Sequence, residues 1–201
     1  IMRNLIITRI ICTFLAIITI MNLICMSVFA DEKEYTLCEV LIEASSGVII
    51  SGQNEEVPVP VGTMAKLMTV LLAAEQVENG KLSFDDTLKT SSYANTMQGA
   101  QIWLMPGEEI TADELFKAVI IGNANDASVV LAEKVAGSEE KFVELMNRRA
   151  QELGLKNTVF TNCNGYYDDN KQISTAYDLA MLCAKLAEYD FLRGYFTCWR
   201  D

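Results

Sequence analysis

Hydrophobic residues change their spacing along this chain, and the change separates a short β region from a longer helical one. Between residues 37 and 44 apolar and polar side chains alternate, which is typical of a half-buried strand. A Ser-Ser-Gly turn at 45–47 follows, and the apolar run 48–50 predicts a returning strand. From Thr63 the apolar residues recur every three or four positions as far as Gly80, which indicates a helix.

Four more helices are predicted after residue 110, each between a start signal and a stop signal. Thr111 and Glu114 form the pattern of a capping box, in which each side chain accepts from the other residue's N–H group. The predicted ranges are 111–121, 125 or 126–136, 138–154 and 174–186. A hairpin followed by helices, without regular alternation, favours an α+β fold with a helical cluster on an antiparallel sheet. The remaining strands of that sheet would have to come from beyond residue 201.

The first thirty residues have the pattern of an export signal. Two arginines precede the apolar stretch 10–29, which ends in the small-x-small pattern that signal peptidases require. We therefore expect a signal peptide over residues 1–30, cleaved after Ala30, and an exported domain over residues 31–201. An uncleaved membrane anchor is the alternative, because the apolar run approaches spanning length.

Composition excludes several kinds of site. The chain contains no histidine, so it cannot by itself build a Ser-His-Asp triad, a Cys-His protease site or a His-ligated metal site. The 16 Lys and Arg residues against 27 Asp and Glu residues give a net charge of −11. Most of such a surface repels a phosphate backbone, so we expect no nucleic-acid partner.

Four cysteines remain after the predicted cleavage, and no two of them form a C-x-x-C pair. They are Cys38, Cys163, Cys183 and Cys198. A four-cysteine zinc site normally needs such close pairs, so we expect no metal. One or two disulfides are compatible with export, and their pairing is left open. We favour buried free thiols, because a core of this size does not need cross-links.

A hydroxyl and an amine stand one helical turn apart in Thr-Met-Ala-Lys, where Thr63 and Lys66 share a helix face. Burial can lower the pKa of a lysine until it acts as a base, and a helix N-terminus stabilises an oxyanion. This is a histidine-free route to an acyl-enzyme. The alternative is that Thr63 is an N-cap and Lys66 a solvated lysine. The same spacing recurs in Ser-Glu-Glu-Lys at 138–141, where the acidic residues indicate an ordinary helix start.

Two asparagines, Asn123 and Asn125, lie two positions apart between two predicted helices. Their side-chain amides would form an exposed polar corner that is able to hold an amide group of a substrate. Taken alone, the pattern is more often that of a turn followed by a helix N-cap.

Many short stretches occur in the order and at the spacing of one known family. They include Leu41-Ile42-Glu43-Ala44, Ser46-Gly47, Lys66-Leu67-Met68-Thr69, Ala73-Ala74-Glu75, Gly107-Glu108, Asn125-Asp126-Ala127, Leu131-Ala132-Glu133, Met146-Asn147, Leu153-Gly154-Leu155, Asn162, Gly165 and Ser174-Thr175-Ala176. Through them the chain resembles the D-alanyl-D-alanine carboxypeptidases, the low-molecular-weight penicillin-binding proteins, over nearly all of residues 31–201. The resemblance implies the β-lactamase-like or transpeptidase-like α+β fold.

The family uses the motifs S-x-x-K, S-x-N and K-T-G. The resemblance implies that Thr63 stands at the acylated nucleophile, Lys66 at its proton acceptor, and Asn125 at the asparagine that holds the substrate's amide. Asn123 stands at the position of the second motif's serine. Threonine adds a methyl group that stiffens χ1 and crowds the attack, and an asparagine cannot pass on a proton as a hydroxyl does. No cofactor and no metal are implied.

The third motif is not found, because no K-[ST]-G follows Asn125. We therefore expect residues 31–201 to be the N-terminal part of a longer catalytic domain. The resemblance implies removal of the terminal D-alanine from peptidoglycan stem peptides ending in D-Ala-D-Ala, and covalent inhibition by β-lactams. It also implies an extracytoplasmic location and membrane association through a C-terminal anchor. The alternatives are a homologue that binds wall peptide without turnover and, less well matched, a class A β-lactamase.

Overall fold

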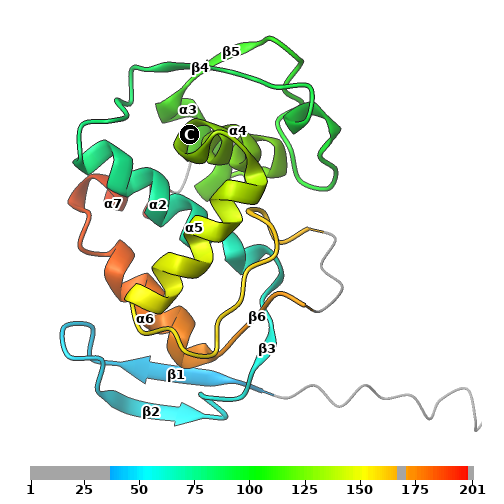
Figure 1. Ribbon diagram of the computed structural model, residues 1–201. Helices are drawn as coiled ribbons and strands as arrows, with labels where there is room; N and C mark the ends of the chain where they lie inside the picture. The colour runs from blue at the N-terminus through cyan, green and yellow to red at the C-terminus, as the bar shows by residue number, and fades with distance from the viewer. Residues whose placement is uncertain (1–36, 167–170, 199–201) are drawn as a thin grey trace, which may run out of the picture. The chain divides into compact units, whose positions relative to one another are not determined.

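The structure is a computed structural model that describes residues 37–166 and 171–198. The signal peptide that we predict over residues 1–30 lies outside the described residues. The predicted hairpin is confirmed, since β1 (Glu39–Ile42) pairs antiparallel with β2 (Ile49–Gln53) in the blue and cyan part of the ribbon (Figure 1).

Gly47 closes the hairpin and brings its turn against helix α6 (Ala176–Leu186). Its φ of 70° is left-handed, a conformation that glycine adopts without steric cost. A Cβ atom at this position would come within 2.9 Å of the Met181 sulfur on α6. Because β1 also packs on α6, the hairpin is held against the helical cluster (Figure 1).

Helix α2 (Lys66–Glu78) lies at the centre of that cluster and follows a short 3₁₀ helix, η1 (Gly62–Ala65). The helices packed around it are α3 (Ala112–Ile120), α4 (Asn125–Ala136), α5 (Glu139–Glu152) and α6. Their shared core contains Met68, Leu71, Leu115, Phe116, Leu131, Phe142, Met146 and Leu182. Residues 68–74 of α2 are all buried, as expected of a helix that is surrounded on every side.

The boundaries of α3, α4, α5 and α6 follow the predicted signals to within two residues, whereas α2 begins three residues after Thr63, which lies in η1. The Thr111 hydroxyl accepts from the Glu114 N–H and the Glu114 carboxylate accepts from the Thr111 N–H, so the capping box is confirmed. The hydroxyls of Ser138 and Thr175 cap α5 and α6. Helix α4 ends at Gly137, whose φ of 85° is the usual left-handed stop.

Several shorter elements are not predicted, because runs of two to four residues show no periodicity. They are β3 (Val59–Pro60), β4 (Thr87–Lys89), η2 (Ala94–Thr96), β5 (Glu109–Thr111), β6 (Ile173–Ser174), η3 (Asp190–Leu192) and α7 (Arg193–Phe196). Strand β3 pairs with β6, which places the start of η1 beside the chain segment that leads into α6. Strand β4 pairs with β5.

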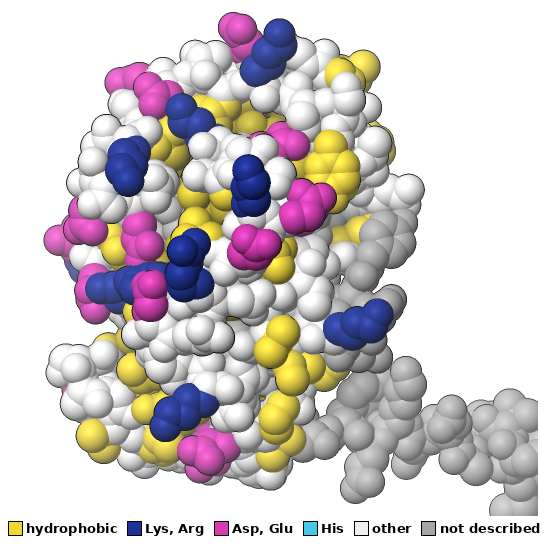
Figure 2. Space-filling model, in the orientation of Figure 1, with side chains coloured by type: hydrophobic (Ala, Val, Ile, Leu, Met, Phe, Trp, Pro, Cys, Tyr) yellow, Lys and Arg dark blue, Asp and Glu magenta, His cyan; other side chains and the backbone are white. Residues whose placement is uncertain are grey.

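The α+β class is confirmed, and the described strands form three two-stranded antiparallel sheets. Within the described ranges, no helix has both the length and the apolar character that crossing a membrane requires. On the face drawn in Figure 2, basic and acidic side chains are interspersed rather than separated.

Candidate active site

Thr63 and Lys66 stand at the junction of η1 and α2, and their environments differ. Thr63 is exposed on η1, whereas Lys66 is the first residue of α2 and is only 5% exposed. Neither η1 nor α2 is capped by a side chain, and their N-cap residues are Val61 and Ala65. The alternative of a capping threonine beside a solvated lysine is therefore wrong.

The Lys66 ammonium group is held by a backbone carbonyl from a distant part of the chain. Its Nζ donates to the carbonyl oxygen of Asn164 at 2.6 Å. Burial lowers the pKa of Lys66 from 10.5 to about 8, and the nearby Cys163 opposes this shift. With that pKa, about a tenth of the molecules carry a neutral lysine at pH 7. A neutral amine three residues after an exposed hydroxyl is able to act as its base when the two groups come within hydrogen-bond distance.

The segment 161–166 carries this carbonyl, and it lies directly against η1. Gly165 has a φ of 74°, and a Cβ atom there would lie 1.8 Å from the Gly62 carbonyl oxygen and 2.7 Å from the Thr63 Cα. Only glycine permits this approach. The Asn162 side chain stabilises the turn, since its Oδ1 accepts from the N–H groups of Asn164 and Gly165.

Asn125 is buried at the start of α4 and presents an unsatisfied acceptor. Its Nδ2 donates to the Gln98 carbonyl at 2.5 Å, while its Oδ1 has no hydrogen-bond partner among the described residues. A buried acceptor without a partner is costly, so a group that donates to it gains binding energy. Because the N-cap of α4 is Ala124, the alternative of Asn125 as a capping residue is wrong.

The next residue, Asp126, fixes the loop that approaches Asn125. Its fully buried carboxylate accepts from the backbone N–H groups of Ile102 and Leu104. Trp103, between them, has a left-handed φ of 63° and an exposed side chain. The loop is thereby tied to the N-terminus of α4.

The 97–99 part of this loop contacts both the start of α4 and the 161–166 segment. A Cβ atom on Gly99 would lie 2.7 Å from the Tyr166 ring and 2.9 Å from the Asn125 amide nitrogen. The Asn164 amide also donates to the Met97 sulfur at 3.4 Å. The 97–99 loop therefore links Asn125 to the segment that holds Lys66.

Asn123 takes a different position from Asn125. It lies exposed in the turn between α3 and α4, with a left-handed φ of 53° that asparagine tolerates better than most residues. Within residues 37–166 and 171–198, its side chain makes no hydrogen bond to Thr63, Lys66 or Asn125. The predicted turn is thus observed at Asn123.

The residues that sequence reasoning missed lie in the 161–166 segment and in the residues that hold it. No sequence motif could have indicated the role of the Asn164 carbonyl, because every residue has a backbone carbonyl. A signal did exist in the Thr-Asn-Cys-Asn-Gly run at 161–165, whose short polar residues and glycine favour a tight turn. Asn162 and Gly165 were apparent only as parts of a resemblance, and nothing local indicated that Gly165 contacts residue 62.

The four cysteines of the described residues are all free. Cys163 is fully buried beside Lys66, whereas Cys183 is exposed and the other two are half-buried, so the preference for free thiols holds and the expected burial applies to Cys163 alone. Among the described residues, no group of three or more His, Cys, Asp or Glu side chains is placed to hold a metal ion.

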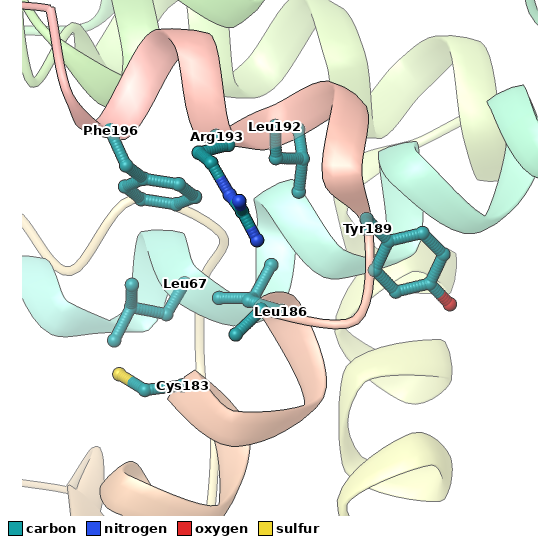
Figure 3. Close-up of a pocket in the computed structure, with 8 residues that line it drawn as sticks. Leu67, Cys183, Leu186, Tyr189, Leu192, Arg193 and Phe196 are labelled. Atoms are coloured by element: carbon teal, nitrogen blue, oxygen red, sulfur yellow. The ribbon is translucent and has the colours of Figure 1, made fainter. Parts of the chain in front are cut away.

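An apolar pocket of about 280 Å³ lies between α2, α6 and α7, and none of its lining residues is Thr63, Lys66 or Asn125 (Figure 3). Leu67, Leu186 and Phe196 turn toward its interior, and the Tyr189 hydroxyl points away from it. The pocket is lined by Cys183 but by no hydroxyl paired with a lysine. It therefore lacks the chemistry of the Thr63 region.

Comparison with known proteins agrees with the motifs. The family model described as D-alanyl-D-alanine carboxypeptidase matches residues 32–198. The chain belongs to the D-alanyl-D-alanine carboxypeptidase family. D-alanyl-D-alanine carboxypeptidase DacF of Bacillus subtilis is 41% identical over 162 residues, which are 81% of this chain and 41% of DacF.

Solved structures of the carboxypeptidase family have the same fold. DacD from Francisella tularensis superimposes with a TM-score of 0.74 at 28% identity, covering 81% of this chain and 40% of that chain. Ampicillin-bound penicillin-binding protein D2 from Listeria monocytogenes superimposes with a TM-score of 0.67 at 26% identity, covering 77% of this chain and 63% of that chain. The present chain spans about two fifths of the length of the curated relatives that it matches.

Proposed function

We propose that the protein carrying this chain is a D-alanyl-D-alanine carboxypeptidase that forms its acyl-enzyme on Thr63. The observation that carries the proposal is the buried Lys66, whose pKa is lowered to about 8, three residues after an exposed hydroxyl in a member of this family. A lysine that is partly neutral at physiological pH supplies the base that a histidine-free chain needs.

In the first step, neutral Lys66 takes the Thr63 hydroxyl proton as the oxygen attacks the carbonyl carbon of the penultimate D-alanine. Negative charge develops on the substrate's carbonyl oxygen, close to the N–H groups at the start of η1 and α2. The Thr63 γ-methyl group restricts the approach, so we expect Thr63→Ser to be acylated faster than the wild type.

In the second step, the bond to the terminal D-alanine breaks and its nitrogen needs a proton. Asn123 cannot relay one, because a neutral amide has no readily exchanged acid proton. The Lys66 ammonium formed in the first step is the group available to return it. The ester on Thr63 is then hydrolysed by water, which regenerates the hydroxyl and releases the shortened peptide.

Asn125 supports substrate positioning in this proposal. Its Oδ1 is unsatisfied but fully buried, so the proposal requires a local shift that exposes it to an amide N–H of the bound peptide, while its Nδ2 stays engaged with Gln98. The substrate would be a peptidoglycan stem peptide ending in D-Ala-D-Ala. β-Lactams would acylate the same hydroxyl, which is in keeping with the ampicillin-bound Listeria relative.

The proposed reaction takes place outside the cytoplasmic membrane, where peptidoglycan lies, and the apolar N-terminal segment supports export. Membrane association through a C-terminal anchor, as the resemblance implies, is part of the same proposal. No cofactor or metal is required by the chemistry of Thr63 and Lys66. The net charge of −11 disfavours a nucleic-acid partner.

The test uses the full-length protein and a fluorescent penicillin. The wild type should acquire a covalent label, the Thr63→Ala variant should acquire none, and Thr87→Ala, at an exposed threonine on β4, should label normally. Release of D-alanine from a peptide ending in D-Ala-D-Ala then separates an enzyme from a homologue that only binds. A folded wild-type protein that takes no label would refute the proposal.

A further inference from the structure

Glu139, the first residue of α5, directs its carboxylate away from its own helix. Its Oε1 accepts from the backbone N–H of Cys163 at 3.0 Å, and its Oε2 accepts from the Tyr93 hydroxyl at 2.5 Å. An acidic residue at this position ordinarily serves the free N–H groups and the dipole of its own helix. Here it instead joins α5 to two segments that lie 24 and 46 residues away in the chain.

The Cys163–Asn164 segment held by Glu139 is the one that receives Lys66. Besides the contacts of Asn164 described above, three side chains of α2 and α5 hold it: Glu139 binds the Cys163 N–H, the Thr69 hydroxyl donates to the Cys163 carbonyl at 2.6 Å, and Lys66 donates to the Asn164 carbonyl. Thr69 and Lys66 both belong to α2, on one side of the segment. Glu139 is its anchor from α5.

We propose that Glu139 is a positioning residue for acylation: by anchoring the Cys163–Asn164 segment, it holds the Asn164 carbonyl against Lys66 and keeps the lysine buried. The inference rests on the proposed function, in which Lys66 is the base. It also gives a role to the second hydroxyl-x-x-lysine stretch, whose Ser138 begins α5 and thereby places Glu139.

The titratable groups around this contact keep their protonation states. Burial, followed by Glu139, raises the pKa of the Cys163 thiol, so this thiol stays neutral. The hydrogen bond to Glu139 raises the pKa of Tyr93, so its hydroxyl remains a donor. Glu140 is the other charged group near Tyr93, and it is exposed.

Removal of the carboxylate would leave the buried Cys163 N–H without its partner. The segment then moves to find another acceptor or admits water, since an unsatisfied buried N–H is costly. Either change alters the Asn164 carbonyl, and water beside Lys66 reduces the desolvation that lowers its pKa. Acylation should slow and should require a higher pH.

The experiment measures penicillin acylation of the full-length protein from pH 6 to 10, at limiting and at saturating penicillin, together with thermal unfolding. Glu139→Ala should lower the acylation rate constant at pH 7 by about tenfold or more, because a small misplacement of a base is costly in rate. In Glu139→Ala, the part of the pH profile in which the acylation rate constant rises should move to higher pH, while the affinity for penicillin changes little. Glu139→Gln should stay within about threefold of the wild type, since its amide oxygen still accepts from the Cys163 N–H. Glu140→Ala, at the exposed neighbour, should match the wild type.

A folded Glu139→Ala protein with the wild-type rate constant and pH profile would overturn the inference, even if its melting temperature fell. If Glu139→Ala does not fold, Glu139→Asp decides, because it keeps the charge but has one methylene fewer to reach Cys163. Glu139→Asp slower than Glu139→Gln supports positioning, and the reverse order overturns it. A folded wild type without label refutes the proposed function and this inference together, whereas the variants above test Glu139 alone.

Discussion

The chain contains the hydroxyl-x-x-lysine spacing twice, and the two copies have opposite environments. At 63–66 the lysine is 5% exposed, donates to the Asn164 carbonyl and has its pKa lowered to about 8. At 138–141 the lysine is exposed, and the serine caps α5 by accepting from the Lys141 N–H. The first pair is suited to chemistry, and the second begins a helix.

The difference comes from the helices that carry the two pairs. Helix α2 is enclosed by four other helices, so a lysine at its first position is desolvated. Helix α5 exposes its first turn, where Glu140 and Lys141 reach solvent. Spacing alone therefore places a hydroxyl and an amine on one face, while the burial of the whole helix decides whether the amine becomes a base.

The largest expected effect is the loss of the buried lysine. Lys66→Ala should lower the rate of penicillin acylation by about 10³-fold, because it removes the base. Lys141→Ala, the matched change in the second pair, should leave that rate unchanged. Fluorescent-penicillin labelling of the full-length proteins, with circular dichroism to confirm folding, makes the comparison. Equal losses in the two variants would contradict the distinction between the pairs.

A second contrast concerns two left-handed glycines, Gly165 beside the first pair and Gly154 after the far end of the helix that the second pair begins. Gly165 faces the Gly62 carbonyl at a distance that no Cβ atom tolerates, whereas Gly154, at the end of α5, has open space around it. Gly165→Ala should lower the free energy of unfolding by about 3 kcal/mol, because strain adds to a backbone clash, and Gly154→Ala by about 1 kcal/mol. Urea unfolding measures both, and similar values for the two would contradict a backbone approach at Gly165 that is too close for a Cβ atom.

Helices and their ends were accessible from sequence because their signals are local. Thr111 with Glu114, Ser138 and Gly137 each act within one turn of the chain, so pattern and structure agree. The pairs β3–β6 and β4–β5 were not accessible, since two or three residues carry no alternation and their partners lie far along the chain. The β1–β2 hairpin could be predicted from the sequence, because one short turn joins its two strands.

The candidate site was accessible only in part. The residue types at 63, 66 and 125 indicated a nucleophile, a base and an amide, yet their environment depends on contacts between distant residues. Lys66 and the Asn164 carbonyl are 98 positions apart in the sequence, and Glu139 and the Cys163 N–H that it binds are 24 positions apart. No local pattern encodes such contacts, which is why a solvated Lys66 and a reactive one could not be separated before the fold was known.

The pH dependence sharpens the comparison further. Acylation requires neutral Lys66, so its rate should rise about tenfold per pH unit below the pKa of about 8 and level off above it. The folded protein binds this proton less tightly than the unfolded chain does, so Lys66 should also make the free energy of unfolding increase as pH rises from about 8 to 10.5. Rate measurements between pH 6 and 9 test the first statement, and a flat profile there would contradict it.

The smallest expected effect lies at the second pair. Ser138→Ala removes the cap of α5, in which the hydroxyl accepts from the Lys141 N–H at 3.4 Å, and should lower the free energy of unfolding by about 1 kcal/mol. Ser138→Asp, which keeps an acceptor, should retain most of that stability. Acylation should stay within about twofold in both variants, because the folded molecules still place Glu139 at the first turn of α5. A large loss of acylation in Ser138→Ala with normal Ser138→Asp would mean that the cap itself, rather than the helix it begins, positions Glu139. The two hydroxyl-x-x-lysine pairs would then be mechanically coupled through the Cys163–Asn164 segment, and the second could no longer be described as a helix start alone.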